Sequence, residues 1–261
     1  MKIPIYQVDA FTSELFSGNP AAVCILDEWP DDTHLQAIAA ENNLSETAFL
    51  LQYDKGFRIR WFTPVTEIAL CGHATLASAF VIFNYLKWPE DIINFQSLRS
   101  GVLSVKRNNE LLEMDFPARP PSKEDIPHRL EEAIKQVLLA VLGTAENLLV
   151  LLENERAVRE LNPDFPLLIQ IEQRSIIVSA PGNQCDFVSR FFASHVGIQE
   201  DPVTGSAHCV LTPYWAKRLG KKKLHALQVS KRGGELFCED RNDRVGIAGR
   251  AVLYLEGTIT I

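Results

Sequence analysis

The sequence predicts a protein of mixed strands and helices that is built as two matching halves. A helix expected from about Ala74 to Leu86 is apolar almost all round, which indicates burial on every side and strands wrapped around it. Helix-start and turn motifs also recur in the same order in both halves of the 261-residue chain, as an internal duplication would produce.

The first half begins with strands and a helix that precede this apolar helix. Asp31 and Asp32 are expected to cap a helix over Thr33–Asn42, whose apolar residues fall on one face. Strands are expected where apolar residues alternate with polar ones or run together between turns, at Ile3–Asp9, Ala21–Leu26, Glu46–Gln52 and Phe57–Phe62.

The second half follows a proline-rich stretch, Pro117 to Ser122, which is typical of a linker. We therefore expect domains at residues 1–118 and 119–250, with residues 251–261 packing on the first. A helix is predicted from about Arg129 to Leu142. Further strands are predicted at Leu148–Leu152, Ser175–Ala180, Asp186–Phe192, Arg244–Ala248 and Ala251–Leu255.

The two halves share short segments at corresponding places. Cys71-Gly72-His73-Ala74 opens the apolar helix, and Thr204-Gly205-Ser206-Ala207 opens a second such segment. Strand glutamines follow at Gln96 and Gln228, each with a glycine five positions later, and hairpin turns follow at Asn108-Asn109 and Asn242-Asp243. A chance alignment of glycine-rich turns is the alternative interpretation.

The composition limits the classes of partner. A formal net charge of −7 argues against nucleic acid or an anionic membrane as the main partner, while small anions stay compatible with it. The first residues lack the features of a signal peptide, and no apolar run reaches the roughly 18 residues of a membrane helix. The five scattered cysteines lack C-x-x-C spacing, which favours reduced thiols over disulfides or structural zinc. We therefore expect a cytoplasmic protein.

Glu46 is the first candidate for chemistry, because it opens a predicted apolar strand within Ser45-Glu46-Thr47-Ala48. Partial burial there is expected to raise the pKa of its carboxyl toward neutrality, which suits general acid/base catalysis. An ordinary acid at a strand edge, or a helix cap, is the alternative interpretation.

Two helix starts carry the other candidate residues. Free N–H groups at a helix N-terminus bind anions; Gly72 and His73 lie at one start, and Asp201 and Ser206 lie at the other. In a duplicated fold the two starts are expected to face one cleft and to hold a carboxylate between them. Capping, or packing of His73 in the core, is the alternative. No familiar metal-binding spacing occurs, so no metal site is predicted.

Segments spread along the whole chain form a recognisable pattern. They are Asp9-Ala10-Phe11-Thr12, Gly18-Asn19-Pro20-Ala21-Ala22-Val23, Leu44-Ser45-Glu46-Thr47-Ala48-Phe49, Phe62-Thr63-Pro64, Leu70-Cys71-Gly72-His73-Ala74-Thr75, Arg190-Phe191-Phe192, Glu200-Asp201-Pro202-Val203-Thr204-Gly205-Ser206-Ala207-His208 and Arg232-Gly233-Gly234-Glu235-Leu236. In them the chain resembles the PhzF (phenazine biosynthesis-like) family, within the group that shares the diaminopimelate epimerase fold. The later segments resemble the animal branch named MAWD-binding protein or phenazine biosynthesis-like domain-containing protein.

The resemblance implies an α+β fold of two pseudo-symmetric, diaminopimelate epimerase-like domains. Each would be a curled, mostly antiparallel sheet around a central helix, with the active site between them. It also implies an isomerase of the racemase and epimerase class or a related one, usually a homodimer, that uses no cofactor and no metal. The expected substrate is a small carboxylate-bearing molecule.

The resemblance also assigns roles to residues. In the family the Glu of the Ser-Glu-Thr segment transfers the proton, which is Glu46 here, and the matching His, Asp and Ser assist. The predicted catalytic residues are Glu46, His73 and Asp201. The predicted substrate-binding residues are Gly72, Thr75, Gly205 and Ser206.

One departure separates this chain from the epimerases and racemases that carry a reactive cysteine in each half. It has Cys71 in the first half but no cysteine at the matching position of the second half. That position is Thr204 by the duplication and Pro202 by alignment with the family. An isomerisation in which Glu46 removes a proton and returns one elsewhere on the same molecule fits better, and Cys71 is predicted to be a small buried residue. A two-cysteine epimerase, and a binding module without turnover, are the alternatives.

Overall fold

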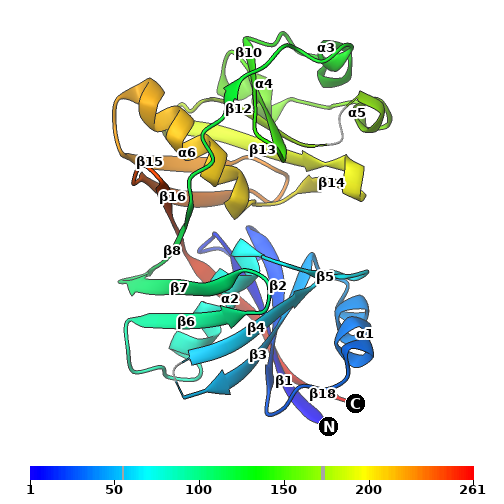
Figure 1. Cartoon of the computed structure of the whole chain (residues 1–261), viewed down its shortest axis with the longest axis vertical. Helices are drawn as coiled ribbons and strands as arrows, with labels where there is room; N and C mark the ends of the chain where they lie inside the picture. The colour runs from blue at the N-terminus through cyan, green and yellow to red at the C-terminus, as the bar shows by residue number, and fades with distance from the viewer. Residues whose placement is uncertain (55, 172–173) are drawn as a thin grey trace. The chain divides into compact units, whose positions relative to one another are not determined.

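The computed structural model describes residues 1–54, 56–171 and 174–261, which form two compact units. The first unit comprises Met1–Asp115 together with Ala248–Ile261, and the second comprises Phe116–Ile247. Figure 1 shows the elements of both units, coloured along the chain. The C-terminal segment thus returns to the first unit, where it forms a strand.

The first unit is a mostly antiparallel sheet with two helices. Its strands are β1 (Lys2–Ala10), β2 (Asn19–Leu26), β3 (Glu46–Tyr53), β4 (Gly56–Phe62), β5 (Glu67–Ile68), β6 (Ile92–Ser97), β7 (Gly101–Asn108), β8 (Leu111–Pro117), which ends past the boundary, and β18 (Ala251–Thr260). Its helices are α1 (Asp32–Asn42) and α2 (Gly72–Asn84). The strands pair in the order β18-β1-β2-β3-β4-β6-β7-β8, and β5 pairs with β4. Only β2–β3 and β4–β6 are parallel among these pairs.

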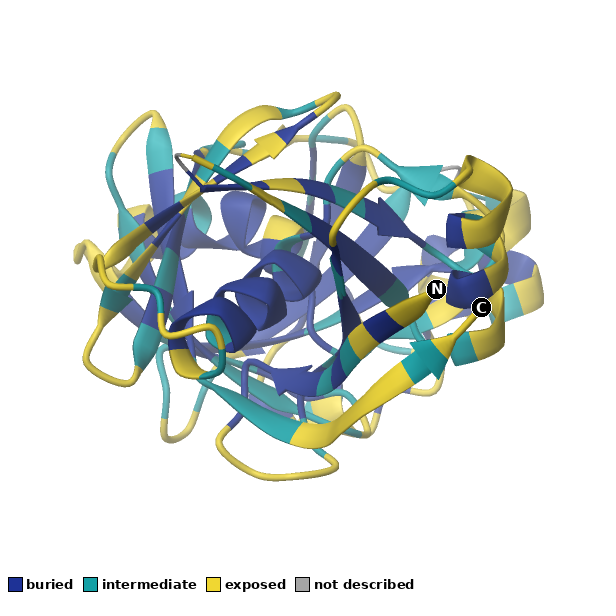
Figure 2. Cartoon of the chain, turned by 90° about the horizontal axis from the view of Figure 1, so that it is seen from below, coloured by how far each residue is buried: buried dark blue, intermediate teal, exposed yellow. Residues whose placement is uncertain are grey.

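Helix α2 is the centre of the first unit. Its residues from His73 to Ala79 and from Val81 to Phe83 are all buried, and it packs on β1, β2, β3 and β18. Figure 2 shows this helix in dark blue with strands around it. Because a helix without a polar face must be covered on all sides, the sheet curls around it. The predicted central helix is confirmed.

The second unit repeats this plan. Its strands are β9 (Ser122–Lys123), β10 (Ala140–Gly143), β11 (Asn147–Leu151), β12 (Ser175–Pro181), β13 (Phe187–Ala193), β14 (Ile198–Asp201), β15 (Lys223–Gln228), β16 (Gly234–Asp240) and β17 (Arg244–Gly249). Its helices are α3 (Leu130–Ile134), α4 (Glu155–Arg159), α5 (Phe165–Ile171), the 3₁₀ turn η1 (Ser194–Val196) and α6 (Gly205–Leu219). The buried helix α6 packs on β15 and β16.

The strand pairings of the two units match in order and direction. The series β10-β11-β12-β13-β15-β16 alternates antiparallel and parallel pairs in the same way as β1-β2-β3-β4-β6-β7. The short strand β14 pairs with β13 as β5 pairs with β4. The predicted α+β class and its pseudo-symmetry are therefore confirmed.

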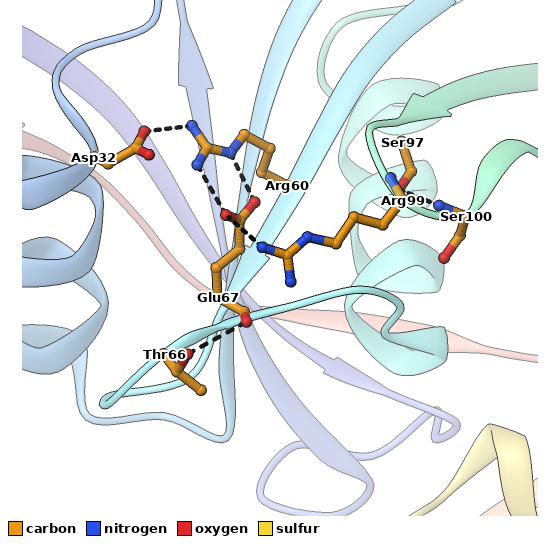
Figure 3. Close-up of polar contacts among 7 residues, drawn as sticks. All are labelled: Asp32, Arg60, Thr66, Glu67, Ser97, Arg99 and Ser100. Atoms are coloured by element: carbon orange, nitrogen blue, oxygen red, sulfur yellow. Dashed lines mark hydrogen bonds and ion pairs between the residues drawn. The ribbon is translucent and has the colours of Figure 1, made fainter.

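An arginine–glutamate clamp, which the sequence did not reveal, lies at the corresponding place in each unit. In the first, Arg60 Nε and Nη2 donate to the two carboxylate oxygens of Glu67 at 2.8 and 2.9 Å, and Figure 3 shows Arg60 between Glu67 and Asp32. In the second, Arg190 donates in the same bidentate manner to Glu200 at 2.6 and 2.8 Å. Each clamp ties the short strand β5 or β14 to its neighbour, just before the chain enters α2 or α6.

The arginine of each clamp is also held against a ring. Its guanidinium carbon lies 5.1 Å from the ring centroid of the phenylalanine two residues later, Phe62 in one unit and Phe192 in the other. Stacking of this kind restricts the guanidinium plane and favours the bidentate geometry. The clamps thus fix the segments that lead into the two buried helices.

The predicted helix from Arg129 to Leu142 is wrong beyond its first turns. Helix α3 ends at Ile134, Lys135 takes a left-handed conformation, and residues 140–143 form strand β10. Within residues 140–143, the half-buried Ala140 and Leu142 alternate with the buried Val141 and Gly143, which is the period of a strand. A continuous apolar run of this length fits either period, so its pairing with β9 and β11 decides.

Two smaller expectations also need correction. Gln96 is exposed whereas Gln228 is buried, so these two glutamines do not occupy equivalent positions, although Gly101 and Gly233 after them share a left-handed φ of +70° and +68°. Asp31 occupies the N-cap of α1, but its side chain makes no capping hydrogen bond, and Asp32 instead accepts from Arg60 at 2.7 Å.

The cysteines are all free, and four of them are buried. In the described part of the chain, no helix combines the length and the apolar character needed to cross a membrane.

Candidate functional site

Glu46 and His73 meet in the first unit. Glu46 is the first residue of β3, and His73 is the second residue of α2. The Oε2 atom of Glu46 lies 3.0 Å from Nε2 of His73, and their side chains are only 12% and 7% exposed. Two of the predicted catalytic residues therefore form one buried acid–base pair.

The local fold explains why these side chains meet. Strand β3 runs parallel to β2, with Glu46 opposite Ala21, so its first residue lies at the end of the sheet. Helix α2 begins at the same end after the extended N-cap residue Cys71. The half-buried Gly72 opens the first turn, where N–H groups have no partner within the helix. The pair thus lies beside a helix start, a feature whose N–H groups can bind an anion.

Asn19 is a third member that the sequence analysis did not assign. Its fully buried amide Nδ2 lies 3.1 Å from Nδ1 of His73. The amide can donate to a neutral ring, and the same amide turned by 180° can accept from a protonated one. Asn19 therefore holds the ring in both states. Its position at the first residue of β2, beside the strand that Glu46 opens, was the available signal.

Cys71 touches the same histidine. Its Sγ lies 3.5 Å from Nδ1 and 4.0 Å from Nε2 of His73. Burial raises the pKa of the Cys71 thiol to about 11, so the thiol is neutral near pH 7. The predicted burial of Cys71 is confirmed, while its contact with His73 is a new finding.

The charge of His73 depends on these neighbours. Burial opposes the charged form, but the Cys71 sulfur and the Glu46 carboxylate outweigh it and hold the pKa of His73 well above its ordinary value. Since the Cys71 thiol is neutral, Glu46 is the charged partner that matters at neutral pH. The site can therefore hold a carboxylate and an imidazolium in contact.

Thr75 has a structural contact. Its hydroxyl donates to the carbonyl of Cys71 at 2.5 Å, its backbone N–H bonds to the same carbonyl, and its side chain is buried. It stabilises the first turn of α2, and that Thr75 also contacts the substrate stays a prediction.

Asp201 in the second unit belongs to a closed hydrogen-bond network. It ends β14, and its Oδ2 accepts from the hydroxyl of Thr204 at 2.5 Å. Gln228 Nε2 donates to the Asp201 carbonyl, and Gln228 Oε1 accepts from the Thr204 N–H, both at 2.8 Å. Gln228, which the sequence analysis used only as a repeat marker, thus fixes both residues.

Gly205 and Ser206 lie in the first turn of α6. Thr204 is the extended N-cap of this helix as Cys71 is of α2. Thr204 therefore occupies the position equivalent to Cys71 within the duplication. The exposed Ser206 occupies the position of His73, and the buried Gly205 that of Gly72. That Asp201, Gly205 and Ser206 take part in the reaction stays a prediction.

His208 is the equivalent of Thr75 and makes the same kind of contact, with Nδ1 at 2.9 Å from the Thr204 carbonyl. Its ring is completely buried beside Phe187, and burial lowers the pKa of His208 to about 4. As the pH falls below about 6.5, the unfolded histidine takes up a proton before the folded one does, so stability is lost.

We expect this histidine to destabilise the second unit by about 2 kcal/mol between pH 7 and pH 5. His208→Asn keeps a donor for Thr204 but does not titrate, so its free energy of unfolding should fall less over this range. Denaturant unfolding at both pH values measures the difference. Equal slopes for the two proteins would contradict the buried, neutral state of His208.

A second prediction concerns Asn19. Asn19→Leu removes the hydrogen bond to Nδ1 of His73, and turnover is expected to fall roughly tenfold, the equivalent of one hydrogen bond, with little change in KM. Asn84→Leu, an exposed amide at the end of α2, is the control and should leave turnover unchanged. A rise in KM with unchanged turnover would show that Asn19 contacts the substrate and does not position His73.

Comparison with known proteins shows the family to which the chain is related. The family described as phenazine biosynthesis-like protein matches residues 8–257. A Pseudomonas aeruginosa protein named uncharacterized isomerase is 53% identical over 261 residues, covering both chains completely. The human phenazine biosynthesis-like domain-containing protein is 42% identical, again over both complete chains.

Solved structures agree with this placement. The structure of a PhzF family protein from Enterococcus faecalis covers both chains completely with a TM-score of 0.97 and 45% identity. A probable proline racemase from Agrobacterium radiobacter matches with a TM-score of 0.63 and 10% identity, covering 99% of this chain and 92% of its own, which shows a shared fold. With its curled, duplicated sheets and its Ser-Glu-Thr and Cys-Gly-His segments, the chain belongs to the phenazine biosynthesis-like (PhzF) family.

Proposed function

We propose that this protein is an isomerase that moves a proton within a small carboxylate-bearing metabolite, with Glu46 as the acid/base group. The observation that carries the proposal is the buried contact of 3.0 Å between Glu46 Oε2 and His73 Nε2. The name isomerase borne by the Pseudomonas aeruginosa relative supports the same class.

In the proposed reaction Glu46 removes a proton from a carbon next to the substrate carboxylate. The negative charge that develops is stabilised by the free N–H groups of the first turn of α2, beside Gly72. Glu46 then returns a proton to another atom of the same molecule, so substrate and product differ only in the position of one hydrogen. His73 supports this cycle because it holds the Glu46 carboxylate in place across their contact of 3.0 Å.

Asp201, Gly205 and Ser206 are proposed to assist at the start of α6. An exposed hydroxyl and a free helix N-terminus can bind a substrate carboxylate. Gln228 and Thr204 hold Asp201 in place through the network described above. We assign Gly205 and Ser206 the binding role and Asp201 an assisting catalytic role, and leave the proton transfer to Glu46.

A single carboxylate, that of Glu46, is favoured over a pair of cysteines as the acid/base group. Cys71 is neutral near pH 7, and the equivalent N-cap position of α6 holds the hydroxyl of Thr204. A thiol that must first lose a proton against its burial is a poor base. We also propose that the reaction needs no cofactor, and that the protein acts in the cytoplasm as a homodimer, as the family resemblance implies.

A metabolite screen in D₂O tests the proposed function. The full-length protein is incubated with mixtures of small carboxylic acids, and mass spectrometry detects substrates that gain one deuterium. Incorporation that depends on the protein is the expected result. Reproducible binding of a metabolite without any incorporation would favour a binding module instead.

A further inference from the structure

We propose that Glu46, Cys71 and His73 form a binding site for a thiophilic divalent cation of the Zn²⁺ class. Such a cation would occupy the same position as the substrate. This inference goes beyond the proposed isomerase, which uses the same residues without any metal.

The distances between the candidate ligand atoms fit a metal. Nε2 of His73 lies 3.0 Å from Glu46 Oε2 and 4.0 Å from Cys71 Sγ, and one ligand atom from each residue falls within 4.8 Å of the others. Around tetrahedral Zn²⁺, with bonds of about 2.0 Å to N and O and about 2.3 Å to S, the ligand atoms are roughly 3.3 to 3.6 Å apart. Small side-chain movements therefore suffice to enclose an ion.

The charges also fit. Ligation displaces two protons, one from the Cys71 thiol and one from Nε2 of His73. A thiolate and the Glu46 carboxylate then together balance the two charges of the cation, with His73 as a neutral third ligand. A buried group that is neutral overall avoids the cost of an isolated charge. Within residues 1–54, 56–171 and 174–261, no other three acidic, histidine or cysteine side chains come together in this way.

Asn19 supplies the outer contact that such a histidine needs. If Nε2 of His73 binds the cation, Nδ1 carries the ring proton and faces the Asn19 amide, 3.1 Å away. A hydrogen bond from the second ring nitrogen to a fixed acceptor orients a ligating histidine. The amide oxygen of Asn19, once turned toward Nδ1, provides that acceptor.

Three protein ligands leave one coordination position open, as in reversible or catalytic zinc sites. The cation would hold the carboxylate of Glu46 and prevent it from accepting a proton. Inhibition of turnover is therefore the expected consequence, and this consequence alone rests on the proposed function.

Metal titration of the full-length protein tests the site without any substrate. In a phosphine reductant, calorimetry should give one equivalent of bound Zn²⁺, and Co²⁺ should give a near-ultraviolet thiolate-to-cobalt band with strong visible bands of a tetrahedral site. Cys71→Ser should abolish the thiolate band and weaken Zn²⁺ binding at least about tenfold. Cys24→Ser, which changes a buried cysteine of the same unit, should change neither.

Absence of Zn²⁺ binding would overturn the proposal, as would unchanged affinity in Cys71→Ser or a Co²⁺ complex without the thiolate band. If Cys71→Ser does not fold by circular dichroism, Glu46→Gln decides: weaker binding with the band retained supports the site, and unchanged affinity contradicts it. Turnover in a protein that binds no metal sinks only this inference. Metal binding by a protein that shows no turnover even when it is free of metal sinks only the proposed isomerase.

Discussion

Glu46→Gln should lower turnover roughly 1,000-fold while the protein stays folded and binds its substrate with little change in affinity. The amide of glutamine has nearly the shape of the carboxylate and can still contact His73, whose Nε2 lies 3.0 Å from Oε2 of Glu46 in the original protein. It cannot accept a proton, however. Steady-state kinetics on the substrate found by the screen, with circular dichroism as the test of folding, measures the effect.

Glu41→Gln is the matched control. Glu41 is an exposed acid of α1 in the same unit, and its replacement should leave kcat and KM unchanged. A Glu46→Gln protein whose kcat stays within about tenfold of the original would show that another group moves the proton.

Arg190→Leu should destabilise the second unit by about 3 kcal/mol. Arg190 makes two hydrogen bonds to Glu200 and one of 2.6 Å to the Leu161 carbonyl, and the side chains of Arg190 and Glu200 are only 12% and 20% exposed. The leucine leaves a partly buried carboxylate without its partner, which costs more than the pair itself contributes. Denaturant unfolding gives the free energy.

Two variants separate the clamp from a general effect of charge. Arg156→Leu breaks an exposed pair with Glu160 in the same unit, whose side chains are 81% and 60% exposed, and should cost at most about 0.5 kcal/mol. Arg190→Leu combined with Glu200→Leu should recover part of the loss, because no charge remains buried. A loss below about 1 kcal/mol for Arg190→Leu would contradict a structural role of the clamp.

Much of the fold was predictable because periodicity and turns are local signals. The apolar helix α2, the strands before it and the repeated helix starts all follow from residue patterns within a few turns. The helix prediction for residues 129–142 was wrong beyond its first turns because its signal was also local. Their apolar run fits a helix or a strand, and only pairing with distant strands decides which of the two forms.

The site was predictable where it follows a short motif and hidden where it depends on contacts across the sheet. Glu46 and His73 lie in recognisable segments, and the structure brings them together. Asn19 joins them although it lies 54 positions before His73 in the sequence. The clamps of Arg60 and Arg190 reach their glutamates at separations of 7 and 10 residues, so no fixed spacing marks them.

The central claim is that one carboxylate, and no thiol, moves the proton. Deuterium incorporation into the substrate in D₂O, compared between Glu46→Gln and Cys71→Ser, tests it most directly. We predict that Cys71→Ser keeps the exchange and Glu46→Gln loses it. Exchange that persists in Glu46→Gln and disappears in Cys71→Ser would contradict the account and identify Cys71 as the base.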